Sequence, residues 1–207
     1  MTAVLVTLTV ILAYLLGSVP SAYLVGRRRR GVDIRQVGSR NMGAMNVFYS
    51  VGFWWGLLVL ALDIGKGAAA VGIATALELP EAARLAAGLV AVLGHIFPVF
   101  LGFKGGKGGA SCIGVLAVLL PWGIPICIGL FGLVLLVTRW PTFSYGVALL
   151  CFPVVGWLHY HRADLAVFAA VLLVIPLVRY IPRLKEMRSK AGNWGRVFRR
   201  RGLEERY

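Results

Sequence analysis

The segment from His95 to Gly109 combines positive charge and small residues in a way that suits binding of a phosphate oxyanion. It reads HIFPVFLGFKGGKGG, and its glycines are Gly102, Gly105, Gly106, Gly108 and Gly109. Lys104 and Lys107 supply the charge, and we expect the glycines to leave backbone N–H groups uncovered for an anion. The spacing is not that of a P-loop, because Lys107 is followed by Gly108 and not by Ser or Thr. We predict an anion site at a membrane surface; the alternative is a flexible basic loop without a ligand.

A second set of polar residues lies in the stretch GVDIRQVGSRNMGAMNVFYS. Ser39, Asn41 and Asn46 place hydroxyl and amide groups among small residues that include Gly38 and Gly43. Such groups can bind a polyol or a phosphate. The alternative is that they cap short interfacial helices, which is a common use of these residue types.

Three ionisable residues fall inside apolar stretches, where a charge is costly. Asp63 and Lys66 are three residues apart in LALDIGKG, so on a helix they share one face and can pair with each other. Such a pair serves either function or a structural tie between helices. We expect His95 to be a hydrogen-bonded packing residue and not a catalyst.

Composition places the chain in a membrane. Hydrophobic residues make up 59% of the 207 residues and charged residues only 14%, so a soluble core cannot bury the apolar surface. The apolar runs are continuous and not alternating, which indicates helices and not a barrel. We therefore predict an all-α integral membrane protein with seven transmembrane helices, at residues 3–25, 53–77, 82–103, 110–120, 123–138, 143–158 and 165–180.

Basic residues gather on one side of these segments. Of the 22 Lys and Arg, 19 fall at residues 27–50, 104–107, 139 and 179–207. By the positive-inside rule these stretches face the cytoplasm, which puts the N-terminus outside and the C-terminus in the cytoplasm. The net charge of +14 is thus a topology signal and not a nucleic-acid interface, although the tail can hold anionic lipid head groups. We divide the chain into a membrane domain, residues 1–185, and a basic cytoplasmic tail, residues 186–207.

Other reactive side chains give no sign of a metal or a cofactor. Cys112, Cys127 and Cys151 lie in apolar segments at unrelated spacings, which argues against a disulfide framework and a zinc site. Neither a Ser/His/Asp triad nor an H-x-x-x-x-D acyltransferase motif is present in the sequence.

Taken together, the motifs resemble a known family. In order along the chain they are GSVPSAYLVGR, GVDIRQVGSRNMGAMNV, LDIGKG and GHIFPVFLGFKGGKGGAS. Their order and spacing resemble the bacterial acyl-phosphate:glycerol-3-phosphate acyltransferase family over residues 17–111, about half the chain. The string G-H-x-F-P-x-F-x-x-F-K-G-G-K-G is highly specific. The resemblance implies seven transmembrane helices with the N-terminus outside, as the charge pattern does.

The resemblance also implies an activity in the bacterial cell membrane. Family members transfer a fatty acyl group from acyl phosphate to the 1-hydroxyl of glycerol 3-phosphate, giving lysophosphatidic acid, and the substrate's own phosphate takes the proton. We expect these two substrates and membrane lipids as partners, cytoplasmic active-site loops, and no cofactor, metal or nucleic acid. The predicted catalytic residues are Ser39, Asn41, Asn46, Lys104 and Lys107. The predicted substrate-binding residues are Asp33, Arg35, Gly38, Gly43, Gly105, Gly106, Gly108, Thr142 and Arg183.

Two family motifs are altered in this chain. After the glycine-serine motif, Met45 and Tyr49 replace a hydroxyl and a cationic residue. In the third motif, H-x-x-N-I-x-R-L, Leu177 and Tyr180 replace His and Asn. The alternative to an active enzyme is therefore a catalytically weak paralogue that binds acyl phosphate or anionic lipid without turnover. A small transporter is disfavoured, because no inverted repeat is evident.

The charge pattern yields a labelling prediction. A cysteine introduced at Ser50, in a background without the native cysteines, should resist a membrane-impermeant thiol reagent in intact cells and react after permeabilisation. A cysteine at Arg162, on the opposite side, should react in intact cells. Labelling of the Ser50 position from outside would reverse the predicted orientation.

Overall fold

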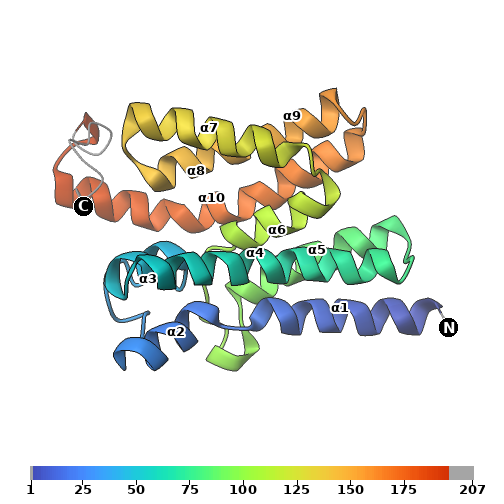
Figure 1. The fold of residues 1–207 in the computed structure, drawn as a ribbon, viewed down its shortest axis with the longest axis horizontal. Helices are drawn as coiled ribbons and strands as arrows, with labels where there is room; N and C mark the ends of the chain where they lie inside the picture. The colour runs from blue at the N-terminus through green and yellow to red at the C-terminus, as the bar shows by residue number, and fades with distance from the viewer. Residues whose placement is uncertain (1, 196–207) are drawn as a thin grey trace. The chain divides into compact units, whose positions relative to one another are not determined.

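The computed structural model describes residues 2–195 (Figure 1), and in that part the regular secondary structure is helical, with no strand. It divides into two compact units, Met1–Leu119 and Leu120–Tyr207. The first unit contains α1 (Thr2–Ser18), α2 (Ser21–Arg30), α3 (Ala44–Ser50), α4 (Phe53–Ala76), α5 (Glu81–Ile96), the 3₁₀ turn η1 (Val99–Leu101) and α6 (Gly109–Leu119). The second contains α7 (Gly123–Thr138), α8 (Pro141–Leu149), α9 (Cys151–Leu158) and α10 (Ala163–Ala191).

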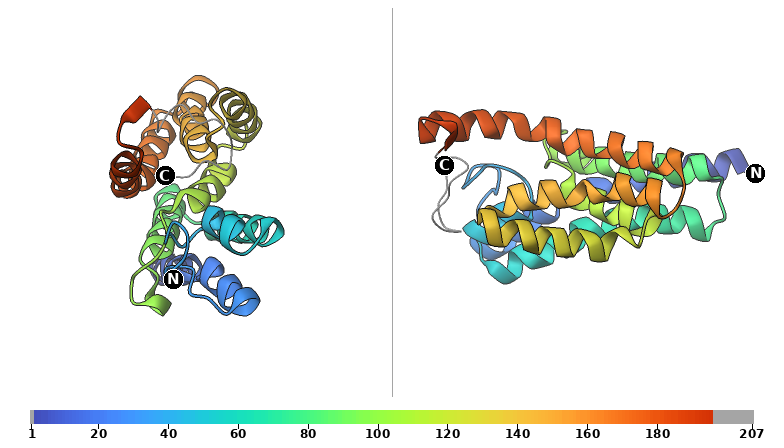
Figure 2. Two further views of the ribbon diagram at one scale, coloured as in Figure 1. Left: turned by 90° about the vertical axis from the view of Figure 1, so that its left-hand side faces the viewer. Right: turned by 90° about the horizontal axis from the view of Figure 1, so that it is seen from above.

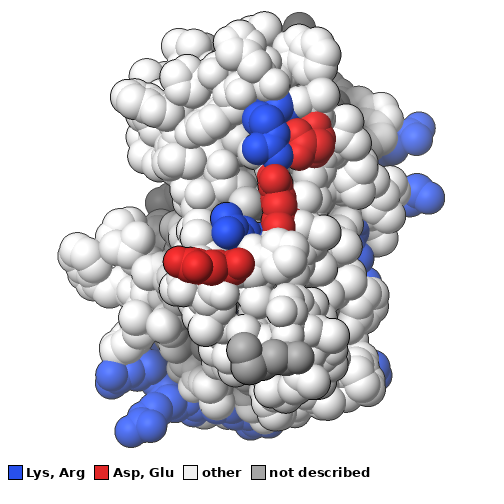
Figure 3. Space-filling view, turned by 90° about the vertical axis from the view of Figure 1, so that its right-hand side faces the viewer, with Lys and Arg blue, Asp and Glu red and all other residues white. Residues whose placement is uncertain are grey.

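The predicted all-α membrane architecture is confirmed at the level of composition and length. Five helical stretches among the described residues are long and apolar enough to cross a membrane: Thr2–Arg30, Phe53–Ala76, Glu81–Leu101, Pro141–Leu158 and Ala163–Ala191. Gly109–Leu119 and Gly123–Thr138 are apolar but shorter. Figure 3 looks along the helices onto one end of them, where a few acidic and basic side chains lie close together among uncharged ones. The count of seven spans and their direction remain predictions.

Glycines set the packing of the first unit, in which α1 lies along α5 and α4 lies along α6 (Figures 1 and 2). A Cβ atom at Gly17 would collide with the backbone of Ala91, and one at Gly67 would collide with the carbonyl of Ser111. Lipid tails are as apolar as the side chains, so membrane helices associate through close van der Waals contact, which small residues permit. These glycines therefore determine how closely the helix pairs approach.

The first helical stretch is interrupted between α1 and α2. Pro20 has no N–H and restricts the residue before it, so α1 ends at Ser18 and α2 begins at Ser21. The carbonyl of Val19 is left outside both helices, and it accepts a hydrogen bond from Lys66 of α4.

In the second unit, α7 packs on α8 and α9 packs on α10. Trp140, Met187 and Ala191 form a buried cluster within it. The predicted boundary between domain and tail, at residues 185 and 186, falls inside α10, which continues to Ala191. Residues 196–207 of the predicted tail lie outside the described residues.

The glycine contacts predict a stability difference within α4. Gly67→Ala should lower the free energy of unfolding by about 1–3 kcal/mol, because the new methyl group overlaps the backbone of α6. Gly72→Ala in the same helix is the matched control, since an added Cβ there meets nothing within 4 Å. Thermal denaturation of both variants in the same detergent measures the difference, and equal midpoints would contradict close α4–α6 packing.

Candidate functional site

Asn46 organises the first loop. Its side-chain Nδ2 donates to the carbonyls of Ile34, Val37 and Asn41 at 2.8, 3.0 and 3.1 Å. Its Oδ1 accepts from the backbone N–H of Ser39 at 3.0 Å and from the Ser50 hydroxyl at 3.3 Å. Asn46 is 3% exposed, so its amide is committed to folding the loop. This geometry supports a positioning role for Asn46, which serves the predicted site through the loop that it holds.

Gly38 and Gly43 accommodate the Asn46 network. Gly38 has a φ of +56°, and an added Cβ there would overlap Asn46 Oδ1 and crowd the Ser50 hydroxyl. A Cβ at Gly43 would lie 2.9 Å from the Asn41 side-chain nitrogen. Both predicted binding glycines therefore provide space for the loop's own amide groups.

Asp33 and Arg35 form a closed pair in the same loop. Asp33 Oδ1 accepts from the Arg35 backbone N–H and from Nε, each at 3.0 Å, and Oδ2 accepts from Nη2 at 2.8 Å. The hydrogen bonds from the Arg35 guanidinium lower the pKa of the Asp33 carboxyl below its ordinary value. Arg35 also lies over the Tyr23 ring, at 5.2 Å from the ring centroid. The arginine is thus held by the loop and by α2.

The glycine-rich segment uses two of the N–H groups that we expected to be uncovered. Gly105 donates to the carbonyl of Ile96 at 3.0 Å, and Gly106 donates to the carbonyl of His95 at 3.1 Å. These bonds fold the segment back onto the end of α5. The expectation was wrong for these two N–H groups, because a chain that reverses direction beside a helix end satisfies the carbonyls of that end.

Available donors lie slightly further along the chain, where α6 begins. The first N–H groups of an α-helix have no partner within the helix, and those of Gly108, Gly109 and Ala110 donate to no backbone acceptor in the described part of the chain. The Ser111 hydroxyl in this first turn is buried, and it makes no hydrogen bond there either. A helix N-terminus with an uncommitted buried hydroxyl suits an anion.

The first loop and the glycine-rich segment meet. A Cβ at Gly106 would collide with the His95 imidazole and with the carbonyl of Met42. Leu101 packs against the small core that contains Ile34 and Met42. The structure therefore brings together two segments that are about sixty residues apart in the sequence.

Side chains available to a ligand remain in both segments. Lys104 is exposed and forms no ion pair with a described residue. The Ser39 hydroxyl and the Asn41 side-chain amide make no hydrogen bond within residues 2–195. Lys107 is half-buried in the same glycine-rich segment. Lys104, Ser39 and Asn41 therefore keep the capacity to bind that the sequence predicted for them.

A buried ionic cluster joins α4 to the end of α5 and to the α1–α2 break. Lys66 Nζ is 3.0 Å from Asp63 Oδ1, which confirms that the two residues pair. Lys66 also donates to the Val19 carbonyl at 3.1 Å, and His95 Nδ1 lies 3.7 Å from Asp63 Oδ1. The proximity of His95 to Asp63 was not apparent in the sequence, because the two residues lie on different helices. Its only sequence signal was an ionisable residue in each of two apolar segments.

The remaining predicted residues belong to the second unit. Thr142 lies in the first turn of α8, and Arg183 of α10 pairs with Glu186 at 2.7 Å. Leu177 is exposed, and the Tyr180 hydroxyl lies 3.8 Å from Met187 Sδ. No group of three or more His, Cys, Asp or Glu among residues 2–195 is arranged to hold a metal ion.

Comparison with known proteins gives consistent matches. Residues 7–190 match the sequence pattern of a family described as glycerol-3-phosphate acyltransferase. The chain is 50% identical to glycerol-3-phosphate acyltransferase 2 of Dehalococcoides mccartyi (strain ATCC BAA-2266 / KCTC 15142 / 195), over 98% of each chain. It is 34% identical to glycerol-3-phosphate acyltransferase of Endomicrobium trichonymphae, over 94% of this chain and 98% of the relative.

A solved structure agrees with these sequence matches. The fold is similar to that of PlsY (YgiH), an integral membrane glycerol 3-phosphate acyltransferase, in its glycerol 3-phosphate form. The TM-score is 0.83 at 30% identity, over 98% of this chain and 95% of that chain.

The contact between Gly106, His95 and Met42 predicts a loss of anion affinity. Gly106→Ala should weaken binding of inorganic phosphate about tenfold or more, because its methyl group forces the segment away and displaces the donors at the start of α6. Isothermal titration calorimetry of the purified protein measures this. Gly72→Ala in α4 is the control, since its Cβ meets nothing within 4 Å and its φ is not positive. Equal affinity in the wild type and both variants would remove this segment from the site.

Proposed function

This chain belongs to the glycerol-3-phosphate acyltransferase family, and we propose that it transfers a fatty acyl group from acyl phosphate to the 1-hydroxyl of glycerol 3-phosphate. The products would be lysophosphatidic acid and inorganic phosphate. Support comes from the similar protein PlsY, an integral membrane glycerol 3-phosphate acyltransferase whose structure is known in a glycerol 3-phosphate form and in a lysophosphatidic acid form. The observation that carries the proposal is the meeting of the first loop with the glycine-rich segment at Gly106 and Met42.

The proposed reaction requires positioning more than covalent assistance. The acceptor oxygen attacks the acyl carbonyl carbon, and the bond from that carbon to the phosphate oxygen breaks. The proton of the hydroxyl passes to a phosphate oxygen, so the electrons and atoms balance without a protein nucleophile. Because the acyl phosphate is already activated, orientation of the two substrates and stabilisation of the departing phosphate supply the rate acceleration.

The first turn of α6 is suited to the phosphate. Uncommitted N–H groups from Gly108 to Ala110 and the Ser111 hydroxyl can donate to phosphate oxygens. Lys104 adds an exposed positive charge next to this turn in sequence, and Lys107 precedes it directly. Charge-assisted hydrogen bonds of this kind are the strong ones.

In the proposed site, the first loop orients the acceptor. Ser39 and Asn41 offer a hydroxyl and an amide, while Asn46 and the Asp33–Arg35 pair hold the loop in shape. We further propose that Thr142 and Arg183 of the second unit contribute to substrate binding, and that the loops face the cytoplasm of a bacterial cell. The fatty chain stays among the helices while its charged head reaches these loops.

A second candidate function is binding without efficient turnover. Met45, Tyr49, Leu177 and Tyr180 replace polar or charged residues of the family motifs. Numbered members 1, 2 and 4 of one Dehalococcoides mccartyi strain are all similar to this chain, so one strain carries several versions of the enzyme. Where one strain carries several versions, one of them can lose catalytic activity while the others supply it.

A turnover assay separates the two candidates. Purified protein supplied with palmitoyl phosphate and glycerol 3-phosphate should form lysophosphatidic acid, and Lys104→Ala should lower kcat/KM about ten- to a hundredfold through loss of a charge-assisted contact. Arg30→Ala is the control for charge, because Arg30 lies at the end of α2, outside both loops. Equal losses from both variants would show that the basic residues act only through collective charge.

Restoring the altered motifs sharpens the assay. Tyr49→Arg, Leu177→His and Tyr180→Asn, singly and together, should raise kcat/KM for glycerol 3-phosphate if missing contacts limit the rate. Strong activity in the wild type that these changes reduce would show a different but complete site. Absence of turnover in every form would favour the binding paralogue.

A further inference from the structure

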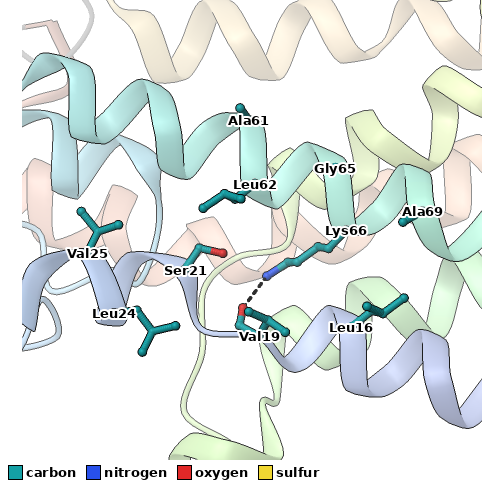
Figure 4. A pocket seen from close by; sticks show the side chains of 10 residues that line it. All are labelled: Leu16, Val19, Ser21, Leu24, Val25, Ala61, Leu62, Gly65, Lys66 and Ala69. Atoms are coloured by element: carbon teal, nitrogen blue, oxygen red, sulfur yellow. Dashed lines mark hydrogen bonds between the residues drawn. The ribbon is translucent and has the colours of Figure 1, made fainter. Parts of the chain in front are cut away.

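An apolar groove of about 350 Å³ runs along the first unit between α4 and the α1–α2 break. Its lining includes Ala61, Leu62, Gly65 and Ala69 of α4, and Val19, Leu24 and Val25 at the α1–α2 break (Figure 4). Leu24 is 53% exposed and Leu62 is 47% exposed, so the groove opens sideways to the surface that faces lipid. Lys66 reaches across it to the Val19 carbonyl, with its charge paired to Asp63.

Gly65 is the reason that the groove is hollow. An added Cβ at Gly65 meets nothing within 4 Å, whereas one at Gly67 would strike the backbone of α6. Gly65 therefore serves no close helix contact, unlike Gly67 two residues later. Its missing side chain leaves open space at the middle of the groove, and an empty apolar space beside lipid is a place for a hydrocarbon chain.

The groove lies at the level of the acyl chains in the bilayer. Arg29 lies over the Trp55 ring, at 3.7 Å from its centroid, and the neighbouring Trp54 is 74% exposed. Tryptophan beside arginine at a helix end marks the membrane–water interface. Gly65 follows Trp55 by ten residues of α4, which corresponds to about 15 Å along the helix and thus to acyl-chain depth.

A positive charge continues the face of α2 that lines the groove. Arg28 follows Leu24 by four residues and Val25 by three, so it continues the face that lines the groove. It is exposed and has no carboxylate partner among the described residues. Arg30, two positions later, is rotated by about 200° and points to the other side of the helix.

We propose that this groove binds one acyl chain of an anionic membrane phospholipid, with the phosphate of its head group at Arg28. Charge complementarity selects an anionic lipid over a zwitterionic one, and the opening toward lipid admits a molecule that diffuses in the bilayer. No residue of the first loop or the glycine-rich segment lines the groove. The site is therefore separate from the one proposed for acyl transfer, and it does not depend on that function.

Native mass spectrometry of the full-length protein tests this. Protein released from bilayers of equal phosphatidylglycerol and phosphatidylcholine, with identical chains, should retain one phosphatidylglycerol. Arg28→Ala should lower the retained ratio of phosphatidylglycerol to phosphatidylcholine about fivefold, the factor for one basic residue near an anionic surface. Arg30→Ala is the matched control and should leave the ratio unchanged. Equal effects of the two variants would overturn the proposal.

A second pair of variants tests the groove itself. Gly65→Leu should fill the space and lower retention of both lipids by about fivefold or more, whereas Gly72→Leu, also in open space on α4, should not. Circular dichroism confirms that each variant is folded, and Gly65→Ala provides a smaller change if the leucine variant is not. Unchanged retention in folded Gly65 variants would contradict the proposal. A raised KM for palmitoyl phosphate with unchanged phospholipid retention would also contradict it, and would assign the groove to the acyl donor.

Discussion

The buried pair of Lys66 and Asp63 is the interaction that joins α4 to the α1–α2 break and to the end of α5. Either charge left unpaired inside apolar helices would cost roughly several kcal/mol. Paired at 3.0 Å, they also satisfy other groups: Lys66 donates to the Val19 carbonyl, and Asp63 faces His95. The cluster therefore links the α1–α2 break to the end of α5, where the glycine-rich segment begins.

Glycine serves two opposite purposes in this unit. At Gly67 and Gly17, the absence of a side chain lets helix backbones touch, which gives dispersion contact where no hydrophobic driving force between helices exists. At Gly65, the same absence leaves a hollow that faces lipid. The difference is not in the residue but in whether a neighbouring helix crosses at that point.

The glycine-rich segment shows how a backbone divides its donors. The N–H groups of Gly105 and Gly106 bind the end of α5, and this fixes the direction in which α6 leaves. The first turn of α6 then presents its own N–H groups, which donate to no backbone carbonyl among residues 2–195. The same segment thus uses some donors to hold its own fold and leaves others available to a ligand. The contact between Gly106 and the Met42 carbonyl places the first loop beside it.

The sequence by itself determined the helical membrane class, the Asp63–Lys66 pair and the family. Composition, helical spacing and motif order can all be read along the chain, without knowing which segments meet in space. It also singled out both loops. Only the tertiary structure decided that Asn46 holds the first loop together, that His95 faces Asp63, and that the N–H groups of Gly108 to Ala110 have no backbone acceptor among residues 2–195. Those facts depend on which segments meet in space, and a hydrogen bond between residues far apart in the chain leaves no periodic pattern from which it can be predicted.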